Sequence, residues 1–217
     1  MGLESKGQDS ASRFATYVEA IASALGHADR AGPFRSYCAG LLLPGDRKSV
    51  EPLAARVEPD RVPAAHQSLH HFVAKSEWSD DTVLAAVRAH VLPVIEQRSR
   101  LRALVVDATG MPKKGTHSVG VSRQYCGQLG KQDNCQLAVS LSAGNDHASL
   151  PIVYRVYLPQ EWCDDPVRRA KVGVPADIVF QTKPQIALDQ LRAAVADGMR
   201  AELVLADAGY GNETDFR

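Results

Sequence analysis

The chain has 217 residues and a mass of 23.4 kDa, and its residues are 45% hydrophobic and 23% charged. This composition is typical of a globular protein with a buried core and excludes disorder along most of the chain. Lys plus Arg and Asp plus Glu both number 25, so any surface that binds nucleic acid must be a local patch, and a protein that coats DNA indiscriminately is disfavoured.

The N-terminal residues 1–12 are polar, and we expect them to be disordered. No stretch has the length and apolar character of a signal peptide or a membrane span, which predicts a cytoplasmic protein. The cysteines are scattered without a C-x-x-C pair, so neither a zinc site nor a disulfide framework is indicated. We expect reduced thiols that fill space at Cys38, Cys126, Cys135 and Cys163.

Residues 13–98 have the pattern of a helical bundle. Ser79 is the predicted N-cap of its last helix, and Pro93 is expected to kink or split that helix. The first helix has an apolar stripe at helical spacing that ends at Gly26, formed by Phe14, Tyr17, Val18, Ile21 and Leu25. Short polar turns separate the further helical segments, at 34–43, 49–57, 63–74 and 79–97.

In the second half of the chain the apolar period becomes that of β-strands. The run 104–107 is apolar up to Asp107 and is followed by small residues and glycine, which indicates a buried strand that ends in a turn. Apolar and polar residues then alternate over 135–142. A turn-rich segment leads from there into a second β-type run at 150–158, so the two runs predict a hairpin.

A helix and one more strand are predicted near the end of the sequence. Residues 159–181 have no clear period and are expected to form an excursion outside the sheet. Thr182 and Gln185 have the spacing of a capping box, which predicts a helix that ends at Gly198. The last apolar run leads to Asp207, which is followed by alanine and glycine, so a second aspartate is expected at a strand end.

The predicted order strand, strand, strand, helix, strand places these two aspartates at one end of a sheet. In an antiparallel meander the first and third strands point the same way, and a helical crossover returns the fourth strand in that direction too. If the first and fourth strands are also neighbours, which parity does not establish, they lie about 4.8 Å apart. Asp107 and Asp207 could then share a divalent cation. The alternative for each aspartate is a turn-capping role at a strand end.

Four segments around these aspartates form extended motifs. They are VDATGMPKKGTHSVGV over 106–121, RQYCGQLGK over 123–131, YLPQEW over 157–162 and LADAGYG over 205–211. These segments closely resemble insertion-sequence transposases of the DDE superfamily endonuclease group. The similarity runs from about Phe14 to the last residue, and motifs of this length are far more specific than a lone carboxylate.

The resemblance implies a fold of the α/β class (α+β overall), in which an N-terminal helical bundle precedes a partial ribonuclease H-like mixed sheet. Residues 13–98 would be a helical DNA-binding region, and residues 99–217 an incomplete ribonuclease H-like catalytic domain. By the same resemblance Asp107 and Asp207 are the first two acids of an Asp-Asp-Glu triad that holds two Mg²⁺ or Mn²⁺ ions. The third acid has no counterpart, since the only later acids, Glu213 and Asp215, lie too close to Asp207.

The implied function is that of a truncated DNA transposase that cleaves DNA strands and transfers them. The implied partner is double-stranded DNA, both element ends and target, with a homodimer as a further option, no membrane, and a location at the nucleoid. Without a third carboxylate one metal site would be underfilled, so we expect weak or absent cleavage by this chain alone. Two alternatives stay open: a non-catalytic DNA-binding or regulatory fragment that occupies element ends, and a non-transposase nuclease on the same fold.

Two groups of side chains are candidates for contacts with DNA. A glycine-rich stretch without acids follows Asp107 and carries basic residues, and its alternative is a solvated hairpin; these residues are Lys113, Lys114, Arg123 and Lys131. The helix expected over 64–74 resembles part of a helix-turn-helix and offers Gln67, Ser68 and His70, and its alternative is a helix that only packs. A zinc site at His66 and His70 is not expected, because no Glu follows His66.

Overall fold

The computed structural model of this chain describes residues 9–216. Residues 1–8, which make up most of the predicted disordered segment, and residue 217 lie outside the described residues. The chain divides into two compact units, and the division falls between Val91 and Leu92, inside helix α5 (Asp80–Glu96). The first unit is helical and the second combines helices with a five-stranded mixed sheet, so the predicted fold class is confirmed.

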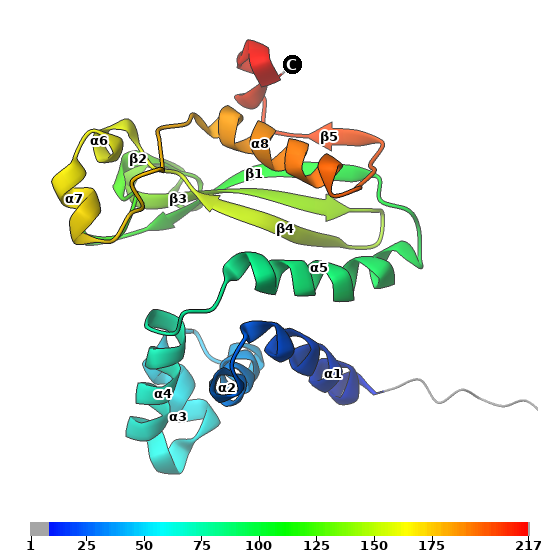
Figure 1. Cartoon of the computed structure of the whole chain (residues 1–217), viewed down its shortest axis with the longest axis vertical. Coiled ribbons are helices and arrows are strands. Elements are labelled where there is room, and N and C mark those ends of the chain that lie inside the picture. Colours follow the sequence, from blue (N-terminus) through cyan, green and yellow to red (C-terminus); the bar gives the residue numbers. More distant parts are fainter. Residues whose placement is uncertain (1–8, 217) are drawn as a thin grey trace, which may run out of the picture. The chain divides into compact units, whose positions relative to one another are not determined.

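The helices of the first unit agree closely with the predicted segments. The first helix begins at Ser10, earlier than expected, because the side chain of Asp9 accepts a hydrogen bond from the backbone N–H of Ser12 at 2.7 Å. Gly26 adopts a left-handed conformation (φ 76°) where this segment ends, as predicted. The helices before α5 are α1 (Ser10–Ala22), α2 (Ala31–Leu42), α3 (Val50–Val57) and α4 (Val62–Ala74) (Figure 1).

Helix α5 starts as predicted and continues where a break was expected. The Ser79 hydroxyl accepts a hydrogen bond from the backbone N–H of Thr82 at 3.2 Å, which makes it the N-cap. The predicted split at Pro93 does not occur: the helix continues through this proline to Glu96 and lacks the one hydrogen bond that an N–H at this position would have donated. Within residues 9–216, no helix is both long and apolar enough to cross a membrane.

The second unit is organised around one long strand, β3 (Lys131–Gly144). Strand β1 (Ala103–Pro112) pairs with it antiparallel along one edge. Two shorter strands share the opposite edge, β2 (Ser122–Cys126) beside the start of β3 and β4 (Ser149–Val156) beside its end. The remaining strand, β5 (Leu203–Leu205), pairs parallel with β1. The predicted antiparallel meander and the predicted direction of the last strand are therefore confirmed, and the two parallel strands are neighbours (Figure 1).

Two details of the sheet differ from the prediction. Asp107 is not the final residue of its strand, because β3 is long enough to pair with β1 as far as Pro112. The segment expected to be a glycine-rich loop contains β2, which pairs with residues 131–135 of β3 and closes a hairpin. Both differences come from pairing with β3. The partner residues of β1 are distant in sequence and leave no local signal, whereas β2 forms a hairpin with the start of β3 across the short turn at 127–130.

Helix α8 (Lys183–Ala196) packs against the sheet through contacts with β3 and β1 (Figure 1). The predicted capping box is present: Gln185 N–H bonds to Thr182 Oγ1 at 3.3 Å, and Thr182 N–H bonds to Gln185 Oε1 at 2.8 Å. On the buried side of the helix, Gln190 Nε2 donates to the carbonyl of Val139 at 3.1 Å. The helix is therefore fixed both at its first turn and along its length.

The excursion between β4 and α8 has its own small core. It contains two short helices, α6 (Gln160–Cys163) and α7 (Pro166–Lys171). Trp162 is fully buried against Val121 and Leu158, and its Nε1–H donates to the carbonyl of Val121 at 2.8 Å. This tryptophan ties the excursion to the segment that precedes β2.

Candidate active site

Asp107, within β1, and Asp207, just after β5, lie at the same level along two neighbouring parallel strands. Strands β1 and β5 pair over three residues, and their last pair is Val105 with Leu205. Each aspartate lies two residues beyond this pair along its own strand direction. Because the strands are neighbours and run the same way, both aspartates lie beyond the same end of the short β1–β5 pairing.

Both aspartates line one pocket of about 410 Å³. The backbone holds one oxygen of each: Asp107 Oδ1 accepts from Ala108 N–H at 2.7 Å, and Asp207 Oδ1 accepts from Gly209 N–H at 2.8 Å. The contact at Asp207 is the turn-capping bond that the alternative reading predicted. Among residues 9–216, neither Oδ2 has a hydrogen-bond donor or an ion-pair partner, so each carboxylate keeps an oxygen for a ligand.

A tyrosine from the motif after the second aspartate completes this side of the pocket. Tyr210 is only 6% exposed, and its buried hydroxyl has no hydrogen-bond partner among the described residues. Burial, followed by the negative charges of Asp107 and Asp207, raises the pKa of Tyr210 to about 12. The hydroxyl therefore stays protonated at neutral pH and can donate a hydrogen bond to an occupant of the pocket.

The side chains in this pocket suit a hard cation. Carboxylate oxygens are the ligands that Mg²⁺ and Mn²⁺ prefer, and two such groups face the pocket with free oxygens. Within the described part of the chain no cluster of three or more His, Cys, Asp or Glu side chains could hold a metal ion. Among residues 9–216, Asp107 and Asp207 are the acidic residues that line this pocket.

A comparison with known families decides where this chain belongs. The model of the family described as DDE superfamily endonuclease matches residues 20–217. The chain is a member of the DDE superfamily endonucleases. It is also 34% identical over 145 residues to a protein of Microchaete diplosiphon described as a probable transposase for insertion sequence element IS701. This match covers 67% of the chain and 35% of the relative, so the chain spans about a third of that relative's length. The predicted resemblance to insertion-sequence transposases is confirmed.

The basic residues predicted to hold DNA lie outside the pocket of this DDE endonuclease. Tyr125 and Gly127, which belong to the same segment, line the pocket. None of the four basic residues is among the described residues that line it. Lys131 Nζ forms an ion pair with Asp133 at 2.9 Å, which partly neutralises its charge. The backbone of Lys113 is held by Asn134, whose Nδ2 donates to the Lys113 carbonyl at 2.7 Å. Lys114 and Arg123 are exposed.

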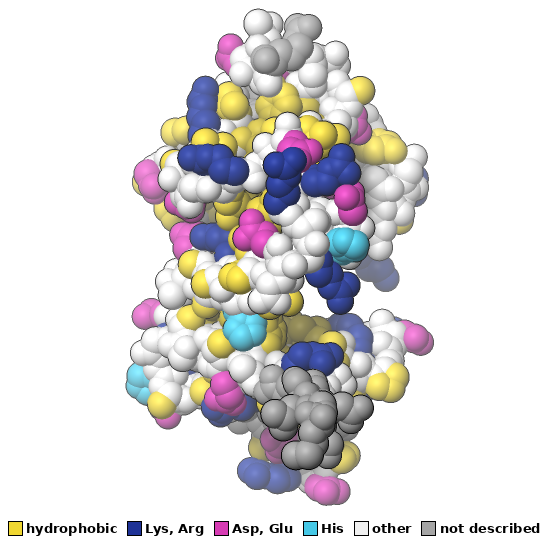
Figure 2. Space-filling model, turned by 90° about the vertical axis from the view of Figure 1, so that its right-hand side faces the viewer, with side chains coloured by type: hydrophobic (Ala, Val, Ile, Leu, Met, Phe, Trp, Pro, Cys, Tyr) yellow, Lys and Arg dark blue, Asp and Glu magenta, His cyan; other side chains and the backbone are white. Residues whose placement is uncertain are grey.

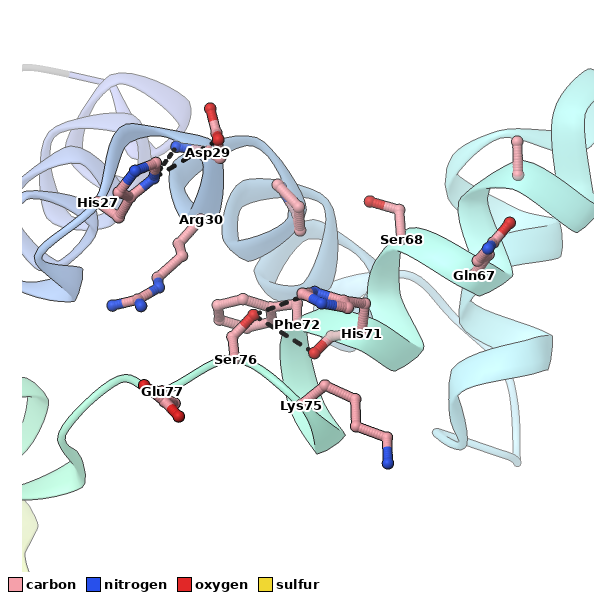
Figure 3. Close-up of a pocket in the computed structure, with 12 residues that line it drawn as sticks. His27, Asp29, Arg30, Gln67, Ser68, His71, Phe72, Lys75, Ser76 and Glu77 are labelled. Carbon is pink, nitrogen blue, oxygen red and sulfur yellow. Dashed lines mark hydrogen bonds and ion pairs between the residues drawn. The ribbon is translucent and has the colours of Figure 1, made fainter.

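Two of the three DNA-binding candidates of the helical unit line one pocket, and the third does not. Gln67 and Ser68 on α4 line a wide pocket of about 680 Å³ (Figure 3). His70 does not line it; its ring lies 6.0 Å from the ring of His66. Sequence reasoning missed the basic residues of this pocket, which come from the turn before α2 and from the end of α4: His27, Arg30, His71 and Lys75. The acids Asp29 and Glu77 line it as well.

Charged side chains of both signs are interspersed on the face of the molecule that Figure 2 shows. In the second unit, Arg102 pairs with Asp146 at 2.8 Å and with Glu202 at 3.6 Å. Arg100 also pairs with Glu202. These ion pairs partly neutralise the two arginines, which agrees with the zero net charge of the chain.

Proposed function

We propose that this chain carries the DNA-cleaving site of an insertion-sequence transposase, with Asp107 and Asp207 as ligands of catalytic metal ions. The observation that carries the proposal is the parallel strand pair that leads both carboxylates into one pocket. Membership of the DDE endonucleases and the identity to a probable IS701 transposase support it. The proposed reaction is cleavage of a DNA strand followed by its transfer to target DNA.

Mg²⁺ or Mn²⁺ fits the pocket, and a two-metal arrangement is proposed. When bound, such ions activate the attacking hydroxyl and stabilise the leaving oxygen. The residues of the chain position the reacting groups: backbone bonds hold the two carboxylates in place, and the Tyr210 hydroxyl offers a donor to a water or phosphate oxygen. Two carboxylates alone leave one site poorly held, so we expect weak cleavage from these 217 residues.

We propose double-stranded DNA as the partner, at element ends and target, and the nucleoid as its location. The helical unit would bind it through the pocket that contains Gln67 and Ser68, where hydroxyl, amide and basic groups can contact phosphates and base edges. Lys113, Lys114 and Arg123 would add contacts beside the catalytic pocket. Homodimerisation is part of the same proposal.

A non-catalytic role is the second candidate. Within residues 9–216, the carboxylates that line the pocket are those of Asp107 and Asp207. In this role the chain would occupy element ends without cleaving them. The two candidates differ in whether the pocket binds a divalent ion.

The experiment that tests the catalytic proposal measures Mn²⁺ binding directly by electron paramagnetic resonance, alongside nicking of supercoiled plasmid. We expect Mn²⁺ to bind the chain, and binding to weaken about tenfold or more in Asp107→Asn and in Asp207→Asn. Asp177→Asn is the matched control, because Asp177 is an exposed acid of the same unit outside the pocket. Unchanged Mn²⁺ binding in both pocket variants, or nicking that survives in Asp107→Asn, would overturn the proposal.

A further inference from the structure

The pocket of the two aspartates also contains one cationic side chain, that of Lys183. Lys183 is the first residue of α8, where the capping box of Thr182 and Gln185 fixes the backbone. Its position is therefore set by a rigid helix start, and not by a flexible loop. From the sequence alone it was only an ordinary residue in the first turn of a helix.

The ammonium group of Lys183 is partly buried and lacks a carboxylate partner. No carboxylate within residues 9–216 lies within 4.0 Å of its Nζ, which instead lies 5.5 Å from the ring centre of Tyr157. Burial lowers the pKa of Lys183, which means that the charged form is less favourable here than in water. An anion that entered the pocket would restore the lost stabilisation of this charge.

The pocket thus contains both acidic and basic side chains. Asp107 and Asp207 suit a cation, but by themselves they would repel the phosphodiester of a DNA strand. Among the described residues that line the pocket, Lys183 supplies the positive charge. Tyr210 is an independent indication of an occupant, because the residue lines the pocket and its buried hydroxyl has no hydrogen-bond partner within residues 9–216.

We propose that Lys183 binds a phosphodiester group of the DNA strand that the pocket receives, and that the Tyr210 hydroxyl donates a hydrogen bond to the same occupant. This inference rests on the proposed DNA-cleaving function and assigns it a phosphate-binding residue. Lys183 contacts the phosphate beside the carboxylates, which orients the strand toward them. Its role is binding, so it is measurable without cleavage.

The test uses the full chain and a short fluorescein-labelled DNA duplex in the presence of Ca²⁺, with binding followed by fluorescence anisotropy. In Lys183→Gln we expect about tenfold weaker binding at low salt, and a slope of log affinity against log salt that is smaller by about 1. Lys183→Arg keeps the charge and should restore the slope. The matched control is Lys171→Gln, an exposed lysine outside the pocket.

A second measurement follows the accessibility of Lys183 in the chain without substitutions. Acetylation of lysines with and without the duplex, followed by mass spectrometry, should show protection of Lys183 by DNA and little protection of Lys171. If DNA leaves both the acetylation of Lys183 and the salt slope of Lys183→Gln unchanged, the inference is wrong. A lower melting temperature of Lys183→Gln with unchanged DNA binding would also overturn it, since the lysine would then only stabilise the fold.

Mn²⁺ binding separates failure of this inference from failure of the proposed function. Lys183→Gln should bind Mn²⁺ at least as well as the unmodified chain, because it removes a positive charge from the pocket. If Asp107→Asn loses Mn²⁺ while Lys183→Gln keeps its DNA affinity, the metal site stands and the phosphate assignment fails. If Asp107→Asn keeps Mn²⁺, the proposed function itself fails.

Discussion

Asp107 and Asp207 occupy equivalent positions on neighbouring parallel strands, each two residues beyond the last pair, Val105 with Leu205. The two strands are separated by about a hundred residues of sequence, and the sheet brings the two aspartates into one pocket. We therefore expect the two carboxylates to act together, so that removal of either one changes how the other binds a ligand.

A double-mutant cycle tests this coupling. If both carboxylates hold the same ion, Asp107→Asn and Asp207→Asn should each weaken Mn²⁺ binding, and the double variant should lose less than the sum of the two effects. Titrations followed by electron paramagnetic resonance give the three free energies. Additive losses would mean that the two aspartates act on separate ions.

Gly120 is predicted to be the glycine least tolerant of a side chain in the second unit. It has φ 71°, and a Cβ there would lie 2.5 Å from the carbonyl oxygen of Tyr157. Gly173 has the same φ with open space around it, so Gly173→Ala measures backbone strain alone, about 1–2 kcal/mol. Gly120→Ala should lower the free energy of unfolding by about 1–3 kcal/mol more, as measured by urea denaturation. Equal losses would show that the segment before β2 yields easily.

Cys38 should make the stability of the helical unit sensitive to alkaline pH. Burial raises the pKa of the Cys38 thiol from 9.0 to about 11. Because this pKa is higher in the folded chain, the contribution is fully present below pH 9 and is lost as the pH rises from 9 toward 11. Cys38→Ala should flatten the fall of unfolding free energy over that range. Some slope should remain, since the pKa of Tyr17 is raised as well, chiefly by burial.

Charge reversal at Lys113 and Lys114 should weaken DNA binding and reduce its dependence on salt. The double variant Lys113→Glu/Lys114→Glu is expected to lower the slope of log affinity against log salt by at least about 2. Lys171→Glu reverses a charge elsewhere in the unit and should change the slope less. An unchanged slope in the double variant would assign the segment to a solvated hairpin.

The helical unit offers a matched set of variants on one helix. Gln67→Ala and Ser68→Ala remove polar groups that line the pocket of Figure 3, and each should weaken DNA binding about three- to tenfold. His70→Ala lies outside that lining and should have a smaller effect. Anisotropy with the labelled duplex ranks the three, and a dominant effect of His70 would move the contact surface to another face of α4.

The helices could be predicted from the sequence because their ends are encoded locally. Ser79, Gly26 and the capping box of Thr182 and Gln185 act within a few residues of themselves. The extent of β1 beyond Asp107 depends on its pairing with β3, whose partner residues are distant in sequence, and short-range patterns do not carry that information.

The residues of the candidate site also differ in whether the sequence could predict them. The two aspartates were identified because each follows an apolar run and lies in a family motif. Lys183 was missed because only the packing of α8 against the sheet brings it into the same pocket. Likewise, Arg30 and Lys75 reach the pocket of Gln67 from segments about 40 residues apart, and no spacing rule joins them.

The two tryptophans of this chain give each unit its own optical signal. Trp78 stacks on Phe72 in the helical unit, with ring centres 5.8 Å apart, and Trp162 is fully buried in the other unit. Emission from Trp78→Phe would therefore come from the sheet unit alone, and emission from Trp162→Phe from the helices alone. Two such variants would reveal whether the halves melt together or in sequence.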